Sequence, residues 1–144
     1  MAQQVNVVNR SNNPLPVYET SGAAGLDIKC TTDFILDSNA RILVPTGLFL
    51  QIPEGYEIQV RPRSGLALKH GITVLNTPGT IDSDYRGELG VILINHGLRS
   101  VEFHAGDRIA QIVLSKVEHV IWNPVPVLDE THRGENGFGS TGGK

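Results

Sequence analysis

The chain has 144 residues and a mass of 15.6 kDa, a length typical of one folded domain. Its residues are 40% hydrophobic and 19% charged, which fits a globular protein and argues against disorder. A formal net charge of −3 argues against bulk nucleic-acid binding, and no apolar run is long enough to span a membrane.

Cysteine usage and the kind of basic residue add to this picture. The start of the chain lacks the apolar core of a secretory signal, and the single cysteine, Cys30, has no partner for an intrachain disulfide. We therefore expect a cytoplasmic protein. Arginines outnumber lysines, eight to four. Because the guanidinium fork suits bidentate phosphate contacts, this bias favours a small phosphorylated ligand.

Short segments of β-branched and alternating residues dominate the chain and predict an all-β fold. Residues 41–44 and 47–52 flank a predicted Pro-Thr-Gly turn, and residues 56–60 alternate apolar and polar side chains. Residues 90–95 and 108–113 have the composition of buried strands. Turn residues recur between these segments at the spacing of a barrel or a sandwich.

A short helix and a glycine-rich tail interrupt the β pattern. Over residues 64–71, a capping serine, good helix formers and a final glycine predict one or two helical turns. The tail from Thr131 to Lys144 has five glycines and one large apolar residue, Phe138, so it cannot form a core of its own. We expect a β-barrel body at 1–130 and a flexible arm at 131–144.

The segment Pro62-Arg63-Ser64-Gly65 is a candidate phosphate site, because it lies where a strand gives way to the helix. Helix N-termini present free N–H groups that bind anions. The alternative is a serine cap beside a solvated arginine. We do not expect the tail to be a Walker A loop, because the residue five positions before Gly143 is Phe138 and no helix is expected there. Its aromatic ring and hydroxyls suit a loop that closes on a nucleotide.

Two acidic residues, Asp82 and Asp27, are candidates for metal or water chemistry. Asp82, held in a dry pocket, could orient and deprotonate a water, whereas Asp84 is expected to pair with Arg86 on the surface. Asp27 interrupts an apolar run, and residues 106–111 have the same form. Asp27 and Asp82 could serve Mg²⁺, which takes few protein carboxylates when it is shared with phosphates. Asp27 could equally be a strand-edge residue. The five histidines lack the spacing of zinc ligands.

Taken in order, these segments resemble the five motifs of the trimeric deoxyuridine triphosphatase (dUTPase) family. The resemblance covers nearly the whole chain and rests on residues 24–27, 62–71, 76–87, 106–111 and 133–142. One departure is Asn136, where the last motif usually has glycine. Because asparagine tolerates left-handed backbone, we expect the arm to keep its function.

The resemblance implies a fold, an assembly and a reaction. The fold would be a distorted jelly-roll-like β-barrel with one short helix, forming a homotrimer whose active sites are shared between subunits. Water would attack the α-phosphorus of dUTP, giving dUMP and pyrophosphate, with Mg²⁺ on the triphosphate. This reaction would keep uracil out of DNA and supply dUMP for thymidylate synthesis, with no nucleic-acid or membrane partner.

The resemblance also implies residue roles. Asp82 would activate the water, and Asp27 would support the metal through water. Tyr85 would pack under the deoxyribose and exclude a 2′-hydroxyl, and Phe138 would cover the uracil. The expected contacts to uracil and deoxyribose are Asn76, Thr80, Ile81, Tyr85, Gly90, Phe138 and Gly139. The expected contacts to the phosphates are Arg63, Ser64, Gly65, Gln111, Arg133, Ser140 and Thr141.

Two other functions remain as alternatives. A dCTP deaminase shares the fold family but would need a different acid–base arrangement. A non-catalytic nucleotide-binding relative should have lost Asp82 or the arm, and the sequence retains both.

Overall fold

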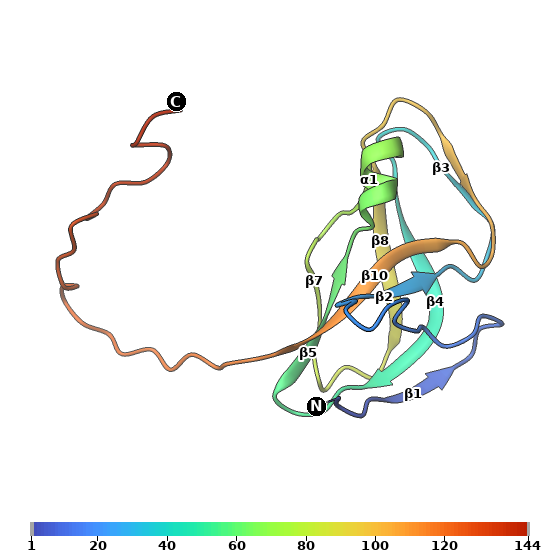
Figure 1. The fold of residues 1–144 in the computed structure, drawn as a ribbon, viewed down its shortest axis with the longest axis horizontal. Helices are drawn as coiled ribbons and strands as arrows, with labels where there is room; N and C mark the ends of the chain where they lie inside the picture. The colour runs from blue at the N-terminus through green and yellow to red at the C-terminus, as the bar shows by residue number, and fades with distance from the viewer. Residues whose placement is uncertain (1, 144) are drawn as a thin grey trace.

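Two four-stranded antiparallel sheets carry most of the chain (Figure 1). The structure is a computed structural model that describes residues 2–143. One sheet has the strand order β1-β4-β8-β6 and the other β2-β10-β5-β7, while β3 and β9 form a small pair. The elements are β1 (Asn6–Asn9), β2 (Leu26–Lys29), β3 (Phe34–Leu36), β4 (Arg41–Gln51), β5 (Tyr56–Arg61), α1 (Ser64–His70), β6 (Ile72–Val74), β7 (Gly79–Ile81), β8 (Glu88–Asn95), β9 (Val101–Phe103) and β10 (Arg108–Lys116).

The core consists of the inward-facing residues of both sheets. Along β8, Leu89, Val91 and Leu93 are buried, while the residues between them face outward, as the two-residue period of a strand requires. Ile28 and Val60 of the other sheet belong to the same cluster. Each such side chain contributes about 1.5–3 kcal/mol by leaving water. The expectation of an all-β, jelly-roll-like fold is confirmed, in the form of two sheets.

Strand β4 differs from the sequence expectation, because no turn separates residues 41–44 from 47–52. The chain runs on through Pro45, Thr46 and Gly47, and the pairing with β8 shifts there. Gly47 has φ of 71°, and its N–H donates to the Glu88 carboxylate over 2.8 Å. A side chain thus replaces a regular ladder bond, so the strand continues through an irregularity instead of reversing.

Helix α1 is correctly located, but its N-terminus differs from the prediction. Ser64 is the first helical residue, Arg63 is the N-cap, and no side chain caps the helix. The hydroxyl of Ser64 is therefore not used as a cap. Gly71 ends the helix with φ of 70° and donates its N–H to the Ala67 carbonyl, as predicted for a glycine stop. Among residues 2–143, no helix is long and apolar enough to span a bilayer.

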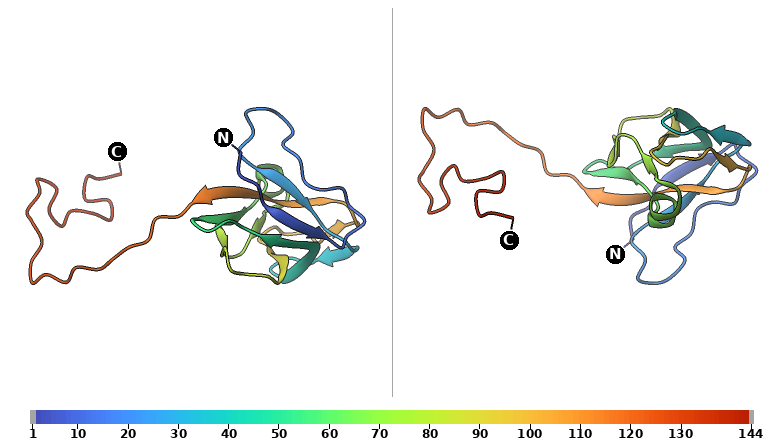
Figure 2. Two further views of the ribbon diagram at one scale, coloured as in Figure 1. Left: turned by 90° about the horizontal axis from the view of Figure 1, so that it is seen from below. Right: turned by 90° about the horizontal axis from the view of Figure 1, so that it is seen from above.

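The tail extends away from the two sheets (Figures 1 and 2). The last strand ends at Lys116, and the N–H of Val117 donates to the Gly55 carbonyl over 2.9 Å. Residues 118–130 are exposed throughout, including Ile121 at 94% and Trp122 at 85% exposure. The division of the chain at residue 131 into body and arm stays a prediction.

Candidate functional site

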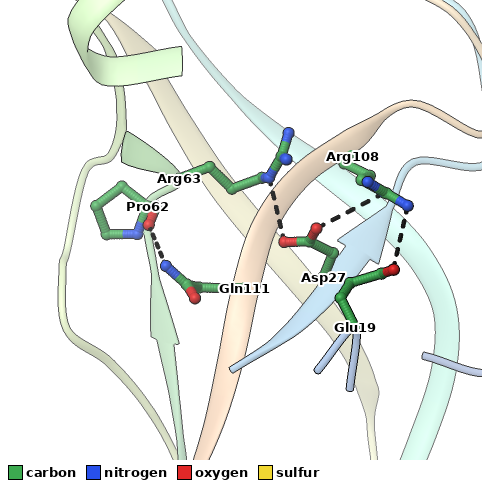
Figure 3. A network of polar contacts seen from close by, with 6 residues as sticks. All are labelled: Glu19, Asp27, Pro62, Arg63, Arg108 and Gln111. Carbon is green, nitrogen blue, oxygen red and sulfur yellow. Dashed lines mark hydrogen bonds and ion pairs between the residues drawn. The ribbon is translucent and has the colours of Figure 1, made fainter. Parts of the chain in front are cut away.

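An ion network surrounds Asp27, which lies on β2 (Figure 3). The Nε of Arg63 donates to Asp27 Oδ1 over 3.1 Å. The Nε of Arg108 lies 3.6 Å from Asp27 Oδ2, and a terminal nitrogen of Arg108 donates to Glu19 Oε1 over 3.2 Å. Side-chain exposure rises outward along this series, from 21% for Asp27 to 57% for Glu19. Each oxygen of the Asp27 carboxylate thus pairs with one arginine side chain.

Arg63 is held through its inner nitrogen alone. In Figure 3 its terminal nitrogens point away from Asp27. Within residues 2–143, neither of them has a hydrogen-bond or ion-pair partner. Two donors of one guanidinium are therefore directed to solvent from a fixed stem, next to the exposed residues Ser64 and Gly65. Such a fork suits a phosphate group.

A β-bulge brings Arg108 and Gln111 to the same face of β10. In the pairing with β2, Arg108 faces Lys29 and Gln111 faces Asp27, with a register shift between Arg108 and Ala110. Three residues on β10 therefore correspond to two on β2. In a regular strand, side chains three residues apart point to opposite faces. The extra residue of the bulge therefore turns the Arg108 side chain to the same face as Gln111. Arg108 thereby reaches Asp27.

Gln111 connects the network to the chain segment that precedes Arg63. Its side-chain Nε2 donates to the carbonyl of Pro62 over 2.9 Å, which joins β10 to the segment just before Arg63 (Figure 3). Its Oε1 occupies the space that a Cβ on Gly25 would need. Glycine in the Ala24-Gly25-Leu26-Asp27 motif is therefore explained by the close approach of Gln111. The motif residues 25, 27, 63 and 111 meet in one place.

A second site, named the hairpin cavity below, is a cavity of about 650 Å³ beside the turn that connects β7 to β8, two strands of different sheets. Asp82 follows β7 at its rim and is exposed in this chain, so the dry pocket expected for it is not formed by its own chain. A Cβ on Gly90 would lie 2.7 Å from the end of the Leu43 side chain, so a larger residue there would displace Leu43 at the cavity wall. The predicted uracil and sugar residues that precede the tail all line this cavity, namely Asn76, Thr80, Ile81, Tyr85 and Gly90.

The turn between β7 and β8 is held by hydrogen bonds to the main chain. The Tyr85 hydroxyl donates to the Glu88 carbonyl over 2.9 Å, and its ring packs over Gly87. The expected pair of Asp84 with Arg86 is wrong, because Arg86 donates to the carbonyls of Ser83 and Tyr85. The Arg86 side chain folds back over its own turn and therefore reaches these carbonyls instead of Asp84. The Tyr85 ring is thereby fixed at the cavity wall.

The tail residues predicted for the site lie apart from both clusters (Figure 2). Arg133 donates from Nε to the carbonyl of Asn136 over 2.8 Å, and Phe138 is fully exposed. Left-handed backbone occurs at Gly134, Phe138, Gly139 and Gly142 and not at Asn136. The replacement of the usual glycine by Asn136 therefore introduces no backbone strain. Ser140 and Thr141 are exposed beside these residues.

The network lies on the β2-β10-β5-β7 sheet, whereas the hairpin cavity is lined by residues of both sheets. Asp27 faces Gln111 and Gln111 faces Arg61, whereas Ile81, next to Asp82, faces Ile58 on β5. With strands about 4.8 Å apart and about 3.3 Å of rise per residue, the Cα atoms of Asp27 and Asp82 are roughly 20 Å apart. None of the network residues lines the hairpin cavity.

Two members of the network, Arg108 and Glu19, were not predicted from the sequence. Arg108 stands in the Gly-Asp-Arg-Ile-Ala-Gln segment, but a two-residue period directs it away from Gln111, and only the bulge reverses this. Glu19 precedes β2 by seven residues, and no sequence pattern connects it to Arg108. Among residues 2–143, no group of three or more acidic, histidine or cysteine side chains could hold a metal ion by itself.

The chain combines a jelly-roll-like body with exposed arginine nitrogens and a cavity that has a carboxylate in its lining. These features define a protein that binds a small anionic ligand. A family model for dUTPase matches residues 11–142. The chain belongs to the dUTPase family.

Relatives agree over nearly the full length. The deoxyuridine 5′-triphosphate nucleotidohydrolase of Fusobacterium nucleatum is 56% identical over 141 residues, which cover 96% of this chain and 97% of that protein. The protein of the same name from Wolinella succinogenes is 59% identical over 131 residues, covering 91% of this chain and 88% of that one.

Solved structures share the fold. The dUTPase of Staphylococcus bacteriophage 80alpha with dUPNHPP superposes with a TM-score of 0.88 at 25% identity, covering 98% of this chain and 99% of that one. A D95N mutant dUTPase from phage phi11 of S. aureus, described with a structural Mg(II) ion, superposes with a TM-score of 0.80 at 21% identity. It covers 89% of this chain and 100% of the phage chain.

Proposed function

We propose that this protein hydrolyses dUTP to dUMP and pyrophosphate in a homotrimer whose active sites are shared between subunits. The observation that carries the proposal is the presence, on one dUTPase-family chain, of two complementary partial sites. One is the arginine network around Asp27, and the other is the hairpin cavity with Asp82 at its rim. The reaction acts on DNA precursors, so a cytoplasmic location is part of the proposal.

In this reaction Asp82 acts as the general base. Its carboxylate orients a water molecule and takes its proton as the water oxygen forms a bond to the α-phosphorus. The bond from the α-phosphorus to the bridging oxygen breaks, and pyrophosphate leaves with that oxygen and its electron pair. The turn between β7 and β8 supports this role, because the N–H of Tyr85 donates to the Asp82 carbonyl over 3.2 Å and fixes the backbone of Asp82.

The arginine network acts on the phosphates. The two terminal nitrogens of Arg63, the Ser64 hydroxyl and the N–H of Gly65 form a set of donors beside Asp27, with Gln111 behind them. Arg133, Ser140 and Thr141 add donors from the tail. Neutralising the triphosphate and aligning the leaving group account for most of the catalysis in phosphoryl transfer.

The Asp27 carboxylate could hold Mg²⁺ only through a water molecule. Both oxygens of Asp27 face arginines, so direct ligation would disrupt two ion pairs. Mg²⁺ keeps several waters and binds mainly through substrate phosphates, so Asp27 would hold one of those waters. When bound, the ion would supply charge neutralisation on the triphosphate.

The hairpin cavity selects the nucleoside. Asn76 and the backbone of Thr80 and Ile81 offer hydrogen-bond donors and acceptors to the uracil edge. Tyr85 contacts the sugar and rejects a 2′-hydroxyl by bulk, a role that the position of its ring at the cavity wall supports. Phe138, exposed in this chain, has a free aromatic face that could cover the base, with Gly139 beside it.

Three features support a site shared between subunits. The network and Asp82 are too far apart on the sheet for one short triphosphate to be held closely by both. Asp82 is open to solvent within its own chain. The tail lies away from both clusters. The arginine network lacks a nearby water-activating carboxylate, and Asp82 lacks nearby phosphate-binding arginines. In each case another copy of the chain would supply the missing residues.

The reaction and the sharing of sites are tested separately. Pyrophosphate release from dUTP, dCTP and UTP should be fast with dUTP alone, whereas ammonia release from dCTP would indicate a deaminase. Light scattering should give about three times the chain mass.

Sharing is tested by mixing two inactive variants, Asp82→Asn and Arg63→Gln, after joint unfolding and refolding. Random assembly gives about a quarter of the sites an intact network from one chain and an intact Asp82 from another. Each variant refolded alone is the control. If the mixture is no more active than the separate variants, the shared-site proposal is wrong.

A further inference from the structure

We propose that Arg108, anchored by Glu19, is a positioning residue for Arg63. It occupies one oxygen of Asp27 and so prevents Arg63 from turning both of its terminal nitrogens onto that carboxylate. This inference rests on the proposed function, in which Arg63 binds substrate phosphates. It assigns a role to two residues outside the predicted site.

The division of the Asp27 carboxylate carries the inference. Oδ1 accepts from Arg63 Nε at 3.1 Å, and Oδ2 lies 3.6 Å from Arg108 Nε. Because Arg63 contacts a single oxygen through its inner nitrogen, its outer pair of donors remains free (Figure 3). A carboxylate with both oxygens available prefers a different partner geometry, two parallel N–H···O bonds from one guanidinium.

Removal of Arg108 makes that competing geometry available. Oδ2 then loses its cation, and Arg63 gains a second acceptor on the same carboxylate. A bidentate pair of Arg63 with Asp27 uses the donors that would otherwise face the triphosphate. The substrate must then break this pair to bind, so affinity falls while the chemistry at Asp82, which lies elsewhere, is unaffected.

Glu19 determines which part of Arg108 faces Asp27. It accepts from a terminal nitrogen of Arg108 over 3.2 Å, which leaves the inner nitrogen toward Oδ2. Both side chains of this outer pair are about half exposed, so the pair is weak by itself. We therefore expect loss of Glu19 to have a smaller effect than loss of Arg108, in the same direction.

The experiment compares Arg108→Gln, Arg108→Lys and Glu19→Gln with the unchanged protein, using Arg99→Gln as a matched control on an exposed arginine. For Arg108→Gln we expect KM for dUTP, and Kd for an imido analogue of dUTP, to rise by about tenfold or more. We expect kcat to stay within about threefold. Arg108→Lys keeps a positive charge near Oδ2 and should restore part of the affinity. Binding of deoxyuridine, which carries no phosphate, should be unchanged.

A double-mutant cycle separates this mechanism from general damage. Asparagine at position 27 cannot accept two parallel bonds, so Arg108→Gln should have less than about a twofold effect on Kd in the Asp27→Asn background. Equal effects in both backgrounds would overturn the inference, as would an unchanged KM in Arg108→Gln.

Melting temperature and light scattering show whether Arg108→Gln folds. If it does not, Glu19→Gln provides the test. We then expect a smaller rise in Kd, and no rise in Kd would contradict the inference. If the unchanged protein does not hydrolyse dUTP, the proposed function fails; if it does and Kd is unmoved, only this inference fails.

Discussion

Thr46, buried in the middle of β4, donates its hydroxyl proton to the carbonyl of Leu89 on β8 over 2.5 Å. The same oxygen accepts from the N–H of Leu48 at 3.3 Å. It therefore satisfies two main-chain groups where the ladder between β4 and β8 is irregular. Replacement by valine, which has the same shape, leaves both groups without a partner.

We expect Thr46→Val to lower the free energy of unfolding by about 1–3 kcal/mol, the cost of unpaired buried polar groups. Denaturant unfolding measures this. Thr46→Ser, which keeps the hydroxyl, should cost less. A valine variant as stable as the original protein would show that the bond contributes nothing.

Asp82→Asn should lower kcat by about 10²–10⁴-fold, because the amide keeps the shape of the carboxylate but cannot accept the proton of the water. Kd for an imido analogue of dUTP should change little. Asp84→Asn, two residues away in the same exposed turn, is the control and should keep normal kcat. Hydrolysis within a few-fold of normal in Asp82→Asn would remove Asp82 from the role of base.

Replacement of Tyr85 should change sugar selection. Tyr85→Leu removes the ring and should raise the ratio of UTP to dUTP hydrolysis, because the sugar pocket gains room for a hydroxyl. Tyr85→Phe loses only the bond to the Glu88 carbonyl, so it should keep most of the discrimination. The ratio of kcat/KM for the two nucleotides is the measurement, and an unchanged ratio in Tyr85→Leu argues against a sugar gate.

Deletion of residues 131–144 should separate activity from stability. These residues add little apolar surface to the core, so the melting temperature without nucleotide should be nearly unchanged. Activity should fall by orders of magnitude, because Arg133, Phe138, Ser140 and Thr141 are lost together and a closing segment excludes water and orients phosphates. Full activity in the shortened protein would contradict the role proposed for the tail.

The Cys30 thiol should react slowly. Burial raises its pKa, and its Sγ–H donates to the His104 carbonyl over 3.0 Å. The folded protein therefore holds the thiol proton more tightly than the unfolded chain, whose thiol ionises near pH 8.5. Above that pH, stability should decrease as pH rises. Alkylation at pH 8.5 should require unfolding, and rapid labelling of the native protein would contradict this.

The alternation of residues 56–60 and the β-branched composition of residues 90–95 were enough to predict two strands. These residues lie within β5 and β8. Sequence patterns failed at Pro45-Thr46-Gly47, because turn residues inside a strand cannot be recognised without the side chains of Thr46 and Glu88 that replace the missing ladder bonds.

The candidate site was predictable where its residues are close in sequence. The predicted residues from Asn76 to Gly90 line one cavity because they belong to one continuous segment that runs through β7 into β8. Arg108 was missed because its direction depends on one extra residue in β10, and Glu19 because its partner is 89 residues away. Such partners are set by tertiary structure, on which local patterns carry no information.

The exposed segment after Lys116 gives the protein an internal optical reporter. Trp122 is the only tryptophan among the 144 residues, and it is 85% exposed. All tryptophan emission therefore comes from one point between β10 and the tail, and in water that emission lies at long wavelength. Contact with another protein surface would shift it to shorter wavelength and slow its quenching by iodide. The surroundings of this segment can thus be followed during dilution, assembly and nucleotide binding without any label.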